Sequence, residues 1–143
     1  MIFKLITPLK HICFFSTIVI TFFISQISLN SFAQTSSNQE IKGVTGGSKN
    51  SGDCGYIASQ PNYVINLSQQ NYSMSVTVET TQGKPTLLVL GPGEGDRYCI
   101  LGESIKGKYP QMGGVWAPGK YLIYVGDSQG NQNPFTLKIS SKK

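Results

Sequence analysis

Few side chains in this chain of 143 residues are able to do chemistry. Its only histidine, His11, and one of its three cysteines, Cys13, lie in an amino-terminal stretch that we interpret as a removable leader. Without them, no Ser-His-Asp or Cys-His arrangement can form, and a zinc site lacks its usual imidazole ligands. A pair of carboxylates is the catalytic route that remains. The spacing of the acidic residues selects no such pair, so we expect a non-catalytic protein; the acids considered are Glu79, Glu94, Asp96 and Glu103.

The leader, residues 1–33, has the regions of a secretory signal peptide. Lys4 and Lys10 supply a basic start, residues 12–24 are apolar, and small residues precede the expected cleavage point after Ala33. The apolar region is shorter than the roughly 20 residues that a membrane-spanning helix needs. We therefore predict cleavage and a secreted or periplasmic protein. The alternative is an uncleaved helix, which would make the chain a membrane-tethered structural or adhesive surface protein.

Two cysteines, Cys54 and Cys99, remain after the leader is removed. In an exported protein such a pair predicts one disulfide bond. The bond would close a long loop and stabilise the fold by about 3–4 kcal/mol in the chain-entropy model. Two unpaired buried thiols are the alternative.

Charge gives little indication of a nucleic-acid partner. The whole chain has a formal net charge of +5, and the leader holds two of its twelve Lys and Arg residues and no acid, so the mature charge is about +3. Arg97 is the single arginine, and the lysines are scattered along the chain. Nucleic-acid readers instead cluster Lys and Arg on one face. We therefore expect no nucleic-acid binding.

A glycine-rich loop at residues 91–96 follows an apolar run. A phosphate-binding loop would need a helix to begin directly after the glycines, whereas the next residues have the pattern of a strand, so we predict a β-hairpin. The loop carries Glu94 and Asp96, and Asp127 lies in a second loop. Carboxylate oxygens are the ligands that calcium prefers. These three acids are a weak candidate calcium site, and calcium is the only cofactor we consider.

Aromatic residues are numerous, with seven tyrosines and one tryptophan. Aromatic rings at the rim of a β-sandwich stack on sugars or anchor protein partners. The candidate ligand-binding rings are Trp116, Tyr98 and Tyr109. The alternative is that these rings fill the core, and for Trp116 we favour the core because the ring precedes a Pro-Gly corner.

Alternation of apolar and polar residues with a period of two is the main secondary-structure signal. It is clearest at residues 72–79, where Tyr72, Met74, Val76 and Val78 alternate with polar residues. Residues 86–90 are apolar throughout, as in a central strand covered on both faces. Further strands are expected at residues 63–68, 97–99, 120–125 and 135–139. No helical period occurs outside the leader, so the fold class is all-β, a small antiparallel β-sandwich.

Other segments are predicted to lack regular structure. Residues 34–50 are rich in Ser, Gly, Asn and Gln, which predicts a flexible linker. After Cys99 frequent glycines indicate a long loop, with at most a short strand near Met112. Pro118 and Gly119 fit the two central positions of a type II turn.

Several of these segments together resemble the bacterial pre-peptidase C-terminal (PPC) domain. The matching stretches are residues 51–57, 86–92, 97–99, 116–121, 124–126 and 134–140. The resemblance implies a jelly-roll-like β-sandwich at residues 51–143, of a kind usually appended to secreted peptidases and other hydrolases. There the domain is thought to aid secretion or bind substrate, without an activity of its own. Members often have a run of aspartates after the second cysteine, but residues 100–103 here are Ile-Leu-Gly-Glu.

The leader runs almost directly into this region, so we expect a free-standing member of the family. Taken together, the sequence predicts a secreted or periplasmic, non-catalytic module that binds a polysaccharide or a protein partner.

Overall fold

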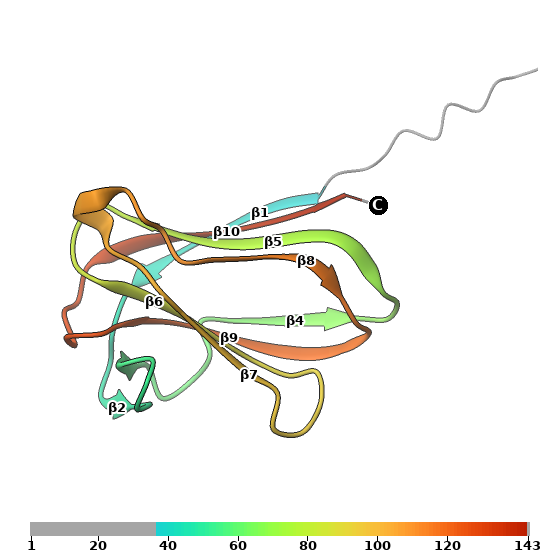
Figure 1. Ribbon diagram of the computed structural model, residues 1–143, viewed down its shortest axis with the longest axis horizontal. Helices are drawn as coiled ribbons and strands as arrows, with labels where there is room; N and C mark the ends of the chain where they lie inside the picture. Colours follow the sequence, from blue (N-terminus) through green and yellow to red (C-terminus); the bar gives the residue numbers. More distant parts are fainter. Residues whose placement is uncertain (1–36, 143) are drawn as a thin grey trace, which may run out of the picture. The chain divides into compact units, whose positions relative to one another are not determined.

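The computed structural model describes residues 37–142, which form two antiparallel β-sheets packed face to face (Figure 1). The predicted signal peptide lies outside the described residues. Over residues 37–142, no helix has the length and hydropathy that crossing a membrane requires. The elements are β1 (Ser37–Val44), β2 (Lys49–Asn50), β3 (Tyr56–Ile57), β4 (Tyr63–Leu67), β5 (Asn71–Thr80), β6 (Pro85–Leu90), β7 (Arg97–Leu101), the 3-10 helix η1 (Ser104–Lys106), β8 (Gln111–Trp116), β9 (Gly119–Asp127) and β10 (Pro134–Lys142).

The order of the strands confirms the predicted β-sandwich and its jelly-roll character. Sheet A has the order β1-β10-β5-β8, and sheet B has the order β2-β3-β9-β6-β7, with β4 also paired to β9. When the two-residue strands β2 and β3 are set aside, each sheet has four strands. Six of the seven connections between these eight strands pass from one sheet to the other, and only the β6–β7 hairpin stays within a sheet.

The core lies between the two sheets and is built from alternate residues of their strands. Met74, Val76 and Val78 of β5 face Leu87 and Val89 of β6, and all five are buried. Burying an aliphatic side chain of this size stabilises the fold by about 1.5–3 kcal/mol. The period-two pattern therefore predicted β4, β5 and β10 and, apart from Tyr72, their inward faces correctly. The strand β6 was predicted from its continuous apolar run.

Sheet B has a second apolar layer on its outer face. Leu88 of β6 points away from the core into a cluster with Cys54, Ile57 and Tyr124. Cys54 lies in the turn before β3 and Ile57 in β3 itself, so this segment packs against Leu88 and Tyr124. The prediction that residues 86–90 form a central strand covered on both faces is confirmed, because only Leu90 is partly exposed in β6.

The predicted flexible linker at residues 34–50 is wrong where the structure describes it. Residues 37–44 form β1, which pairs along its whole length with β10, from Ser37 opposite Ser141 to Val44 opposite Pro134. An edge strand needs few apolar residues, because its main chain is held by a neighbour and one of its faces meets water. Gly43 marks the packed side, since a Cβ there would lie 2.6 Å from the Phe135 ring.

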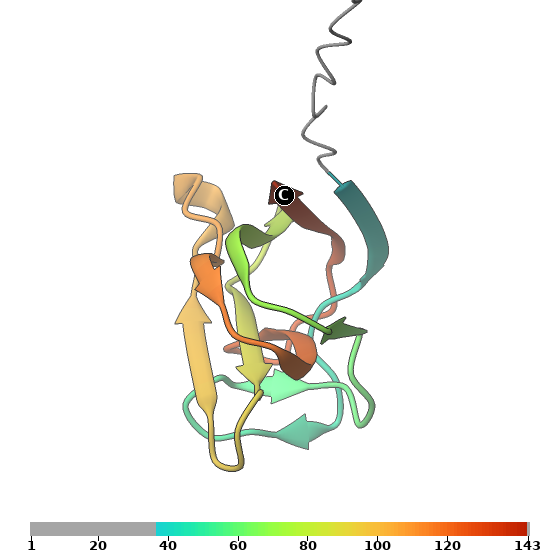
Figure 2. The same cartoon turned by 90° about the vertical axis from the view of Figure 1, so that its right-hand side faces the viewer.

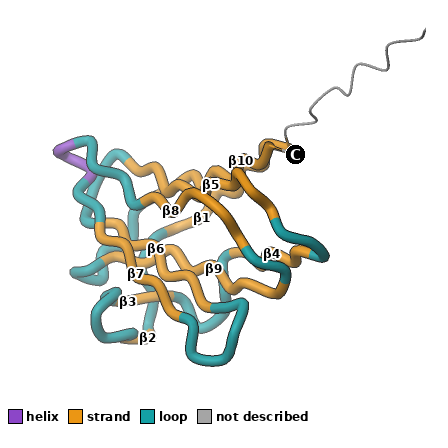
Figure 3. Tube along the Cα trace, turned by 45° about the vertical axis from the view of Figure 1, so that its right-hand side comes forward, coloured by secondary structure: helices purple, strands orange, loops and turns teal. Residues whose placement is uncertain are grey.

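The expected loop after Cys99 also contains more structure than predicted. The glycine-rich segment that includes Met112 forms the six-residue strand β8, paired with β5. The helix η1 and the β6–β7 hairpin loop lie at opposite ends of β7 (Figure 2), and the chain reaches β8 through η1 (Figure 3). Gly119 has a φ of +140°, which differs from the type II turn we predicted but still favours glycine.

Candidate functional site

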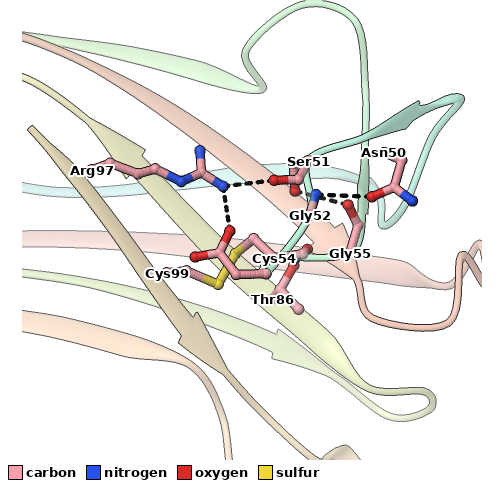
Figure 4. Close-up of a disulfide and its surroundings, with 9 residues drawn as sticks. Asn50, Ser51, Gly52, Cys54, Gly55, Thr86, Arg97 and Cys99 are labelled. Atoms are coloured by element: carbon pink, nitrogen blue, oxygen red, sulfur yellow. Dashed lines mark hydrogen bonds and ion pairs between the residues drawn. A yellow bond between two sulfur atoms is a disulfide. The ribbon is translucent and has the colours of Figure 1, made fainter. Parts of the chain in front are cut away.

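Cys54 and Cys99 form the predicted disulfide bond, with their Cα atoms 5.6 Å apart (Figure 4). The bond joins β7 to the turn at residues 51–55, which lies on the outer face of sheet B. Hydrogen bonds also fix this turn: the Ser51 hydroxyl donates to the Gly55 carbonyl, and the Thr86 hydroxyl donates to the Cys54 carbonyl, each at 2.8 Å. The outer face of sheet B is therefore closed by a cross-linked turn.

The single arginine takes part in the same closure. The guanidinium of Arg97 donates to the Ser51 carbonyl at 2.9 Å (Figure 4). It also pairs with the carboxylate of Asp53. The hydrogen bond from Arg97 holds the pKa of Asp53 below its ordinary value. Arg97 thus contacts the turn, and we assign it a structural role.

The three acids of the candidate calcium site do not come together. Glu94 and Asp96 lie in the β6–β7 hairpin, and the Asp96 carboxylate accepts a hydrogen bond from the Gly93 amide. Asp127 is fully buried at the opposite end of β9, where its carboxylate accepts bonds from the amides of Lys84, Gln129 and Asn131.

The strand register excludes a joint site. Asp127 is opposite Pro85 at the start of β6, whereas the hairpin follows Leu90 at its end. Five residues of strand separate the two positions by about 16 Å at 3.3 Å per residue. Over residues 37–142, no three His, Cys, Asp or Glu side chains are grouped closely enough to hold a metal ion.

The three candidate ligand-binding rings also lie in different parts of the fold. Trp116 is 2% exposed and packs edge-on against Tyr121, with the ring centroids 4.8 Å apart, so the ring lies in the core as we favoured. Tyr98 is half-exposed on β7, in sheet B. Tyr109 is also half-exposed, but it lies beside sheet A and lines a cavity there.

Sheet A has an outer face that no other described segment covers with an apolar layer. The residues that point outward alternate with the core residues, and nearly all are polar. We call this surface the polar face; it consists of Asn38, Glu40 and Lys42 of β1, Thr136, Lys138 and Ser140 of β10, Ser75, Thr77 and Glu79 of β5, and Gln111 and Gly113 of β8.

Three adjoining cavities of about 300, 370 and 450 Å³ follow the polar face along its strands. The first two share Asn38, Ser75, Gln111 and Ser140, and the third continues from Glu79 to Tyr109. The face is hollow because the residues opposite one another in its middle are small. Ser75 is opposite Ser140 on one side and Gly113 on the other.

The polar groups of the face are ordered by contacts among themselves. The Gln111 amide donates to the Ser75 hydroxyl at 2.9 Å. The Lys138 ammonium is 2.8 Å from the Glu79 carboxylate, and this hydrogen bond raises the pKa of Lys138. Two acids and two lysines belong to the face, so its charges balance. The arrangement places hydroxyl and amide groups at the regular spacing of the strands along the outer face of sheet A.

Sequence reasoning missed most of these residues. Ser75, Thr77 and Ser140 were visible as the polar positions of two alternating strands, and we interpreted them only as the solvent side. That β1 and β8 flank these strands could not be known from the local pattern, because neither segment had been predicted as a full strand. Of the predicted ligand-binding rings, only Tyr109 belongs to the site.

Comparisons with known proteins identify a family for this chain. No protein-family model matches the chain. No solved structure matches it significantly. An uncharacterized protein of Synechococcus elongatus is 40% identical over 108 residues, which cover 73% of this chain and 77% of that protein. The chain therefore belongs to the same family as this Synechococcus elongatus protein.

Proposed function

We propose that this chain is an exported, non-catalytic β-sandwich module that binds a polysaccharide through the polar face of sheet A. The observation that carries the proposal is the hollow over Ser75, Ser140 and Gly113, lined by hydroxyl and amide groups and continuous along the strands. Sugar hydroxyls both donate and accept hydrogen bonds, as Ser, Thr, Asn and Gln side chains do. An extended sugar chain is therefore a ligand that such a surface fits.

Export is supported by the composition of the leader and by the cross-link. Disulfides persist in oxidising compartments outside the cytosol, and Cys54–Cys99 is compatible with such a location. The resemblance to the PPC domain supports the same proposal, because that domain accompanies secreted hydrolases. We accordingly propose that the chain is a PPC-like module.

The chemistry of the face favours a polysaccharide over a protein partner. The central part of a protein–protein interface is enriched in aromatic and apolar residues. The middle of the polar face has none, and its ring, Tyr109, lies at one end. Its carboxylates do not form a catalytic pair, since Glu79 is engaged by Lys138, so we propose binding without hydrolysis.

The proposal is tested by filling the hollow. A Cβ at Gly113 would lie 3.6 Å from the Ser75 hydroxyl, an ordinary contact, so Gly113→Tyr should fold and occupy the cavity. We would screen the mature protein against an array of neutral and charged polysaccharides, then repeat the screen with Gly113→Tyr. The control is Ser59→Tyr, which adds the same ring at an exposed position outside the face.

We expect the wild-type protein and Ser59→Tyr to bind the same polysaccharide and Gly113→Tyr to lose that binding. Failure of the wild-type protein to bind any polysaccharide would overturn the proposal. Equal binding by Gly113→Tyr would place the ligand elsewhere on the molecule. Release of reducing sugar by the wild-type protein would refute the non-catalytic part.

A further inference from the structure

The exposure of Tyr72 departs from the alternation of buried and exposed residues along β5. Strict alternation from Met74 and Val76 would place its ring in the core, yet the residue is 74% exposed. The register of β5 against β8 shifts at this point, because Asn71 is opposite Trp116 and Met74 is opposite Gly114. Two residues of β5 therefore oppose one residue of β8, which is the arrangement of a β-bulge.

A bulge of this kind redirects a side chain, and bulges are over-represented next to functional sites. A tyrosine ring buries a large apolar area when it enters a core. Leaving the ring of Tyr72 outside forgoes that stabilisation. A ligand that covers the ring would recover it.

Tyr72 lines a cavity of about 520 Å³ where β4 turns into β5. Its other walls are mainly amide and hydroxyl residues: Asn66 at the end of β4, Ser68, Gln69 and Gln70 of the turn, and Asn71 at the start of β5. Asn71 is held in place, since its amide donates to the Ser141 hydroxyl and its side-chain oxygen accepts from the Ser73 amide. The cavity thus combines an exposed tyrosine with the hydrogen-bonded amide of Asn71 and the amides of Gln69 and Gln70.

This cavity continues the polar face. Lys142 lines both the turn cavity and the first cavity of the polar face. Tyr72 lines the turn cavity, and the next residue, Ser73, lines the first cavity of the polar face. A ligand extended along the sheet would therefore pass Lys142 and reach the ring. Tyr109 lies at the other end of the same path.

We infer that the turn cavity is a further subsite for the same sugar chain, with Tyr72 as its stacking ring. The inference depends on the proposed polysaccharide binding. It adds a substrate class: a linear glycan, bound along its length, whose affinity rises once it is long enough to pass beyond the polar face. A hydroxyl-bearing sugar ring has an apolar face for Tyr72 and hydroxyls for the amides of Gln69 and Gln70.

The test is calorimetric titration with oligosaccharides of increasing length, cut from the polysaccharide that binds the wild-type protein. The variants are Tyr72→Ala and Tyr72→Phe, with Tyr98→Ala as the control because Tyr98 is a half-exposed tyrosine in sheet B. We expect affinity to rise with length in the wild-type protein. Tyr72→Ala should lose roughly three- to tenfold in affinity for the long chains only.

Tyr72→Phe should keep the affinity for long chains, since the ring remains, and Tyr98→Ala should match the wild-type protein throughout. The melting temperature of Tyr72→Ala should not change, because the residue is exposed. Unchanged affinity of Tyr72→Ala for the longest chain would overturn the subsite and leave the proposed function standing. An equal loss for short and long chains would also overturn it. Absence of polysaccharide binding by the wild-type protein would overturn both.

Discussion

The two sheets of this sandwich have outer faces of opposite character. Sheet B turns Leu88 and Tyr124 outward and covers them with a turn that is cross-linked through Cys54. Sheet A turns Ser75 and Ser140 outward and leaves a hollow over them. One face thus adds a third layer to the core, while the other has an uncovered surface of hydrogen-bonding groups.

This difference shows how a small domain can be stabilised on one face while the other face keeps a polar, uncovered surface. A domain of this size buries a modest share of its surface, so a cross-link and an extra apolar layer contribute substantially. With stability supplied by sheet B and the common core, the outer face of sheet A is free to keep short polar side chains. Substitutions should therefore have different consequences on the two faces.

The largest effect should come from the core that both faces share. Trp116→Ala removes a ring that is 2% exposed and contacts Tyr121, and the cavity left behind should cost about 3–5 kcal/mol of unfolding free energy. Chemical denaturation measures this loss. The indole should also emit at a blue-shifted wavelength and resist quenching by iodide. A readily quenched, red-shifted emission would contradict the core assignment.

Removing the cross-link should weaken sheet B and spare the polar face. The cysteines are 45 residues apart in the sequence, so the double variant Cys54→Ser with Cys99→Ser should lose about 4 kcal/mol of stability in the chain-entropy model. Denaturant titration of the variant beside the wild-type protein measures the loss. If the folded variant also lost polysaccharide binding, the two faces would not be independent. Two alkylatable thiols in the native, unreduced protein would refute the bond itself.

A matched pair of glycines sharpens the comparison. On sheet B, a Cβ at Gly126 would meet Thr86 and lie 2.7 Å from the Tyr56 carbonyl, so Gly126→Ala should cost about 1–3 kcal/mol. On sheet A, a Cβ at Gly113 has room, so Gly113→Ala should change stability by less than about 0.5 kcal/mol. Equal unfolding midpoints for the two variants would show that the covered and uncovered faces do not differ.

The smallest effect should come from the ion pairs, and it should have opposite pH dependence on the two faces. The pKa of Asp53 is lowered by Arg97, so this pair stabilises sheet B above the unfolded pKa of about 3.9 and loses its effect as pH falls through the lowered value. The pKa of Lys138 is raised by Glu79, so that pair stabilises sheet A below about 10.4 and loses its effect as pH rises through the raised value.

Denaturation midpoints measured across pH test this contrast. The small difference between Asp53→Asn and the wild-type protein should disappear in acid, and that between Lys138→Gln and the wild-type protein should disappear in alkali. Differences that stay constant over the whole pH range would show that neither pair contributes through its charge.

The parts of the fold that sequence predicts are those whose signal is local. Strands β5, β6 and β9 carry their own alternation or apolar run. Only two cysteines remain once the predicted leader is removed, and this count alone indicates that they pair. Strands β1 and β8 do not, because an edge strand such as Ser37–Val44 is fixed by its hydrogen bonds to β10, nearly a hundred residues away. Their polar and glycine-rich composition resembles that of loops.

The candidate site was harder to predict for the same reason. The polar face brings together four strands that are not consecutive in the chain, so Asn38, Ser75 and Ser140 become neighbours only after the sandwich forms. Tyr72 was predicted to follow the alternation of β5, and a bulge overrides that pattern. Of the three candidate rings only Tyr109 lies beside the polar face, because Trp116 belongs to the core and Tyr98 to sheet B, and the sequence shows neither placement.

The proposed division of roles, in which sheet B supplies stability and sheet A binds the ligand, is tested most directly by mapping where a ligand contacts the protein. Backbone amide chemical shifts, followed while the polysaccharide that binds is titrated into the mature protein, report which residues meet it. We predict changes at Ser75, Gly113 and Ser140, with none at the Cys54 turn. Changes confined to sheet B, around Leu90 and its β9 partner Leu122, which line a cavity with the β6–β7 hairpin, would contradict the account.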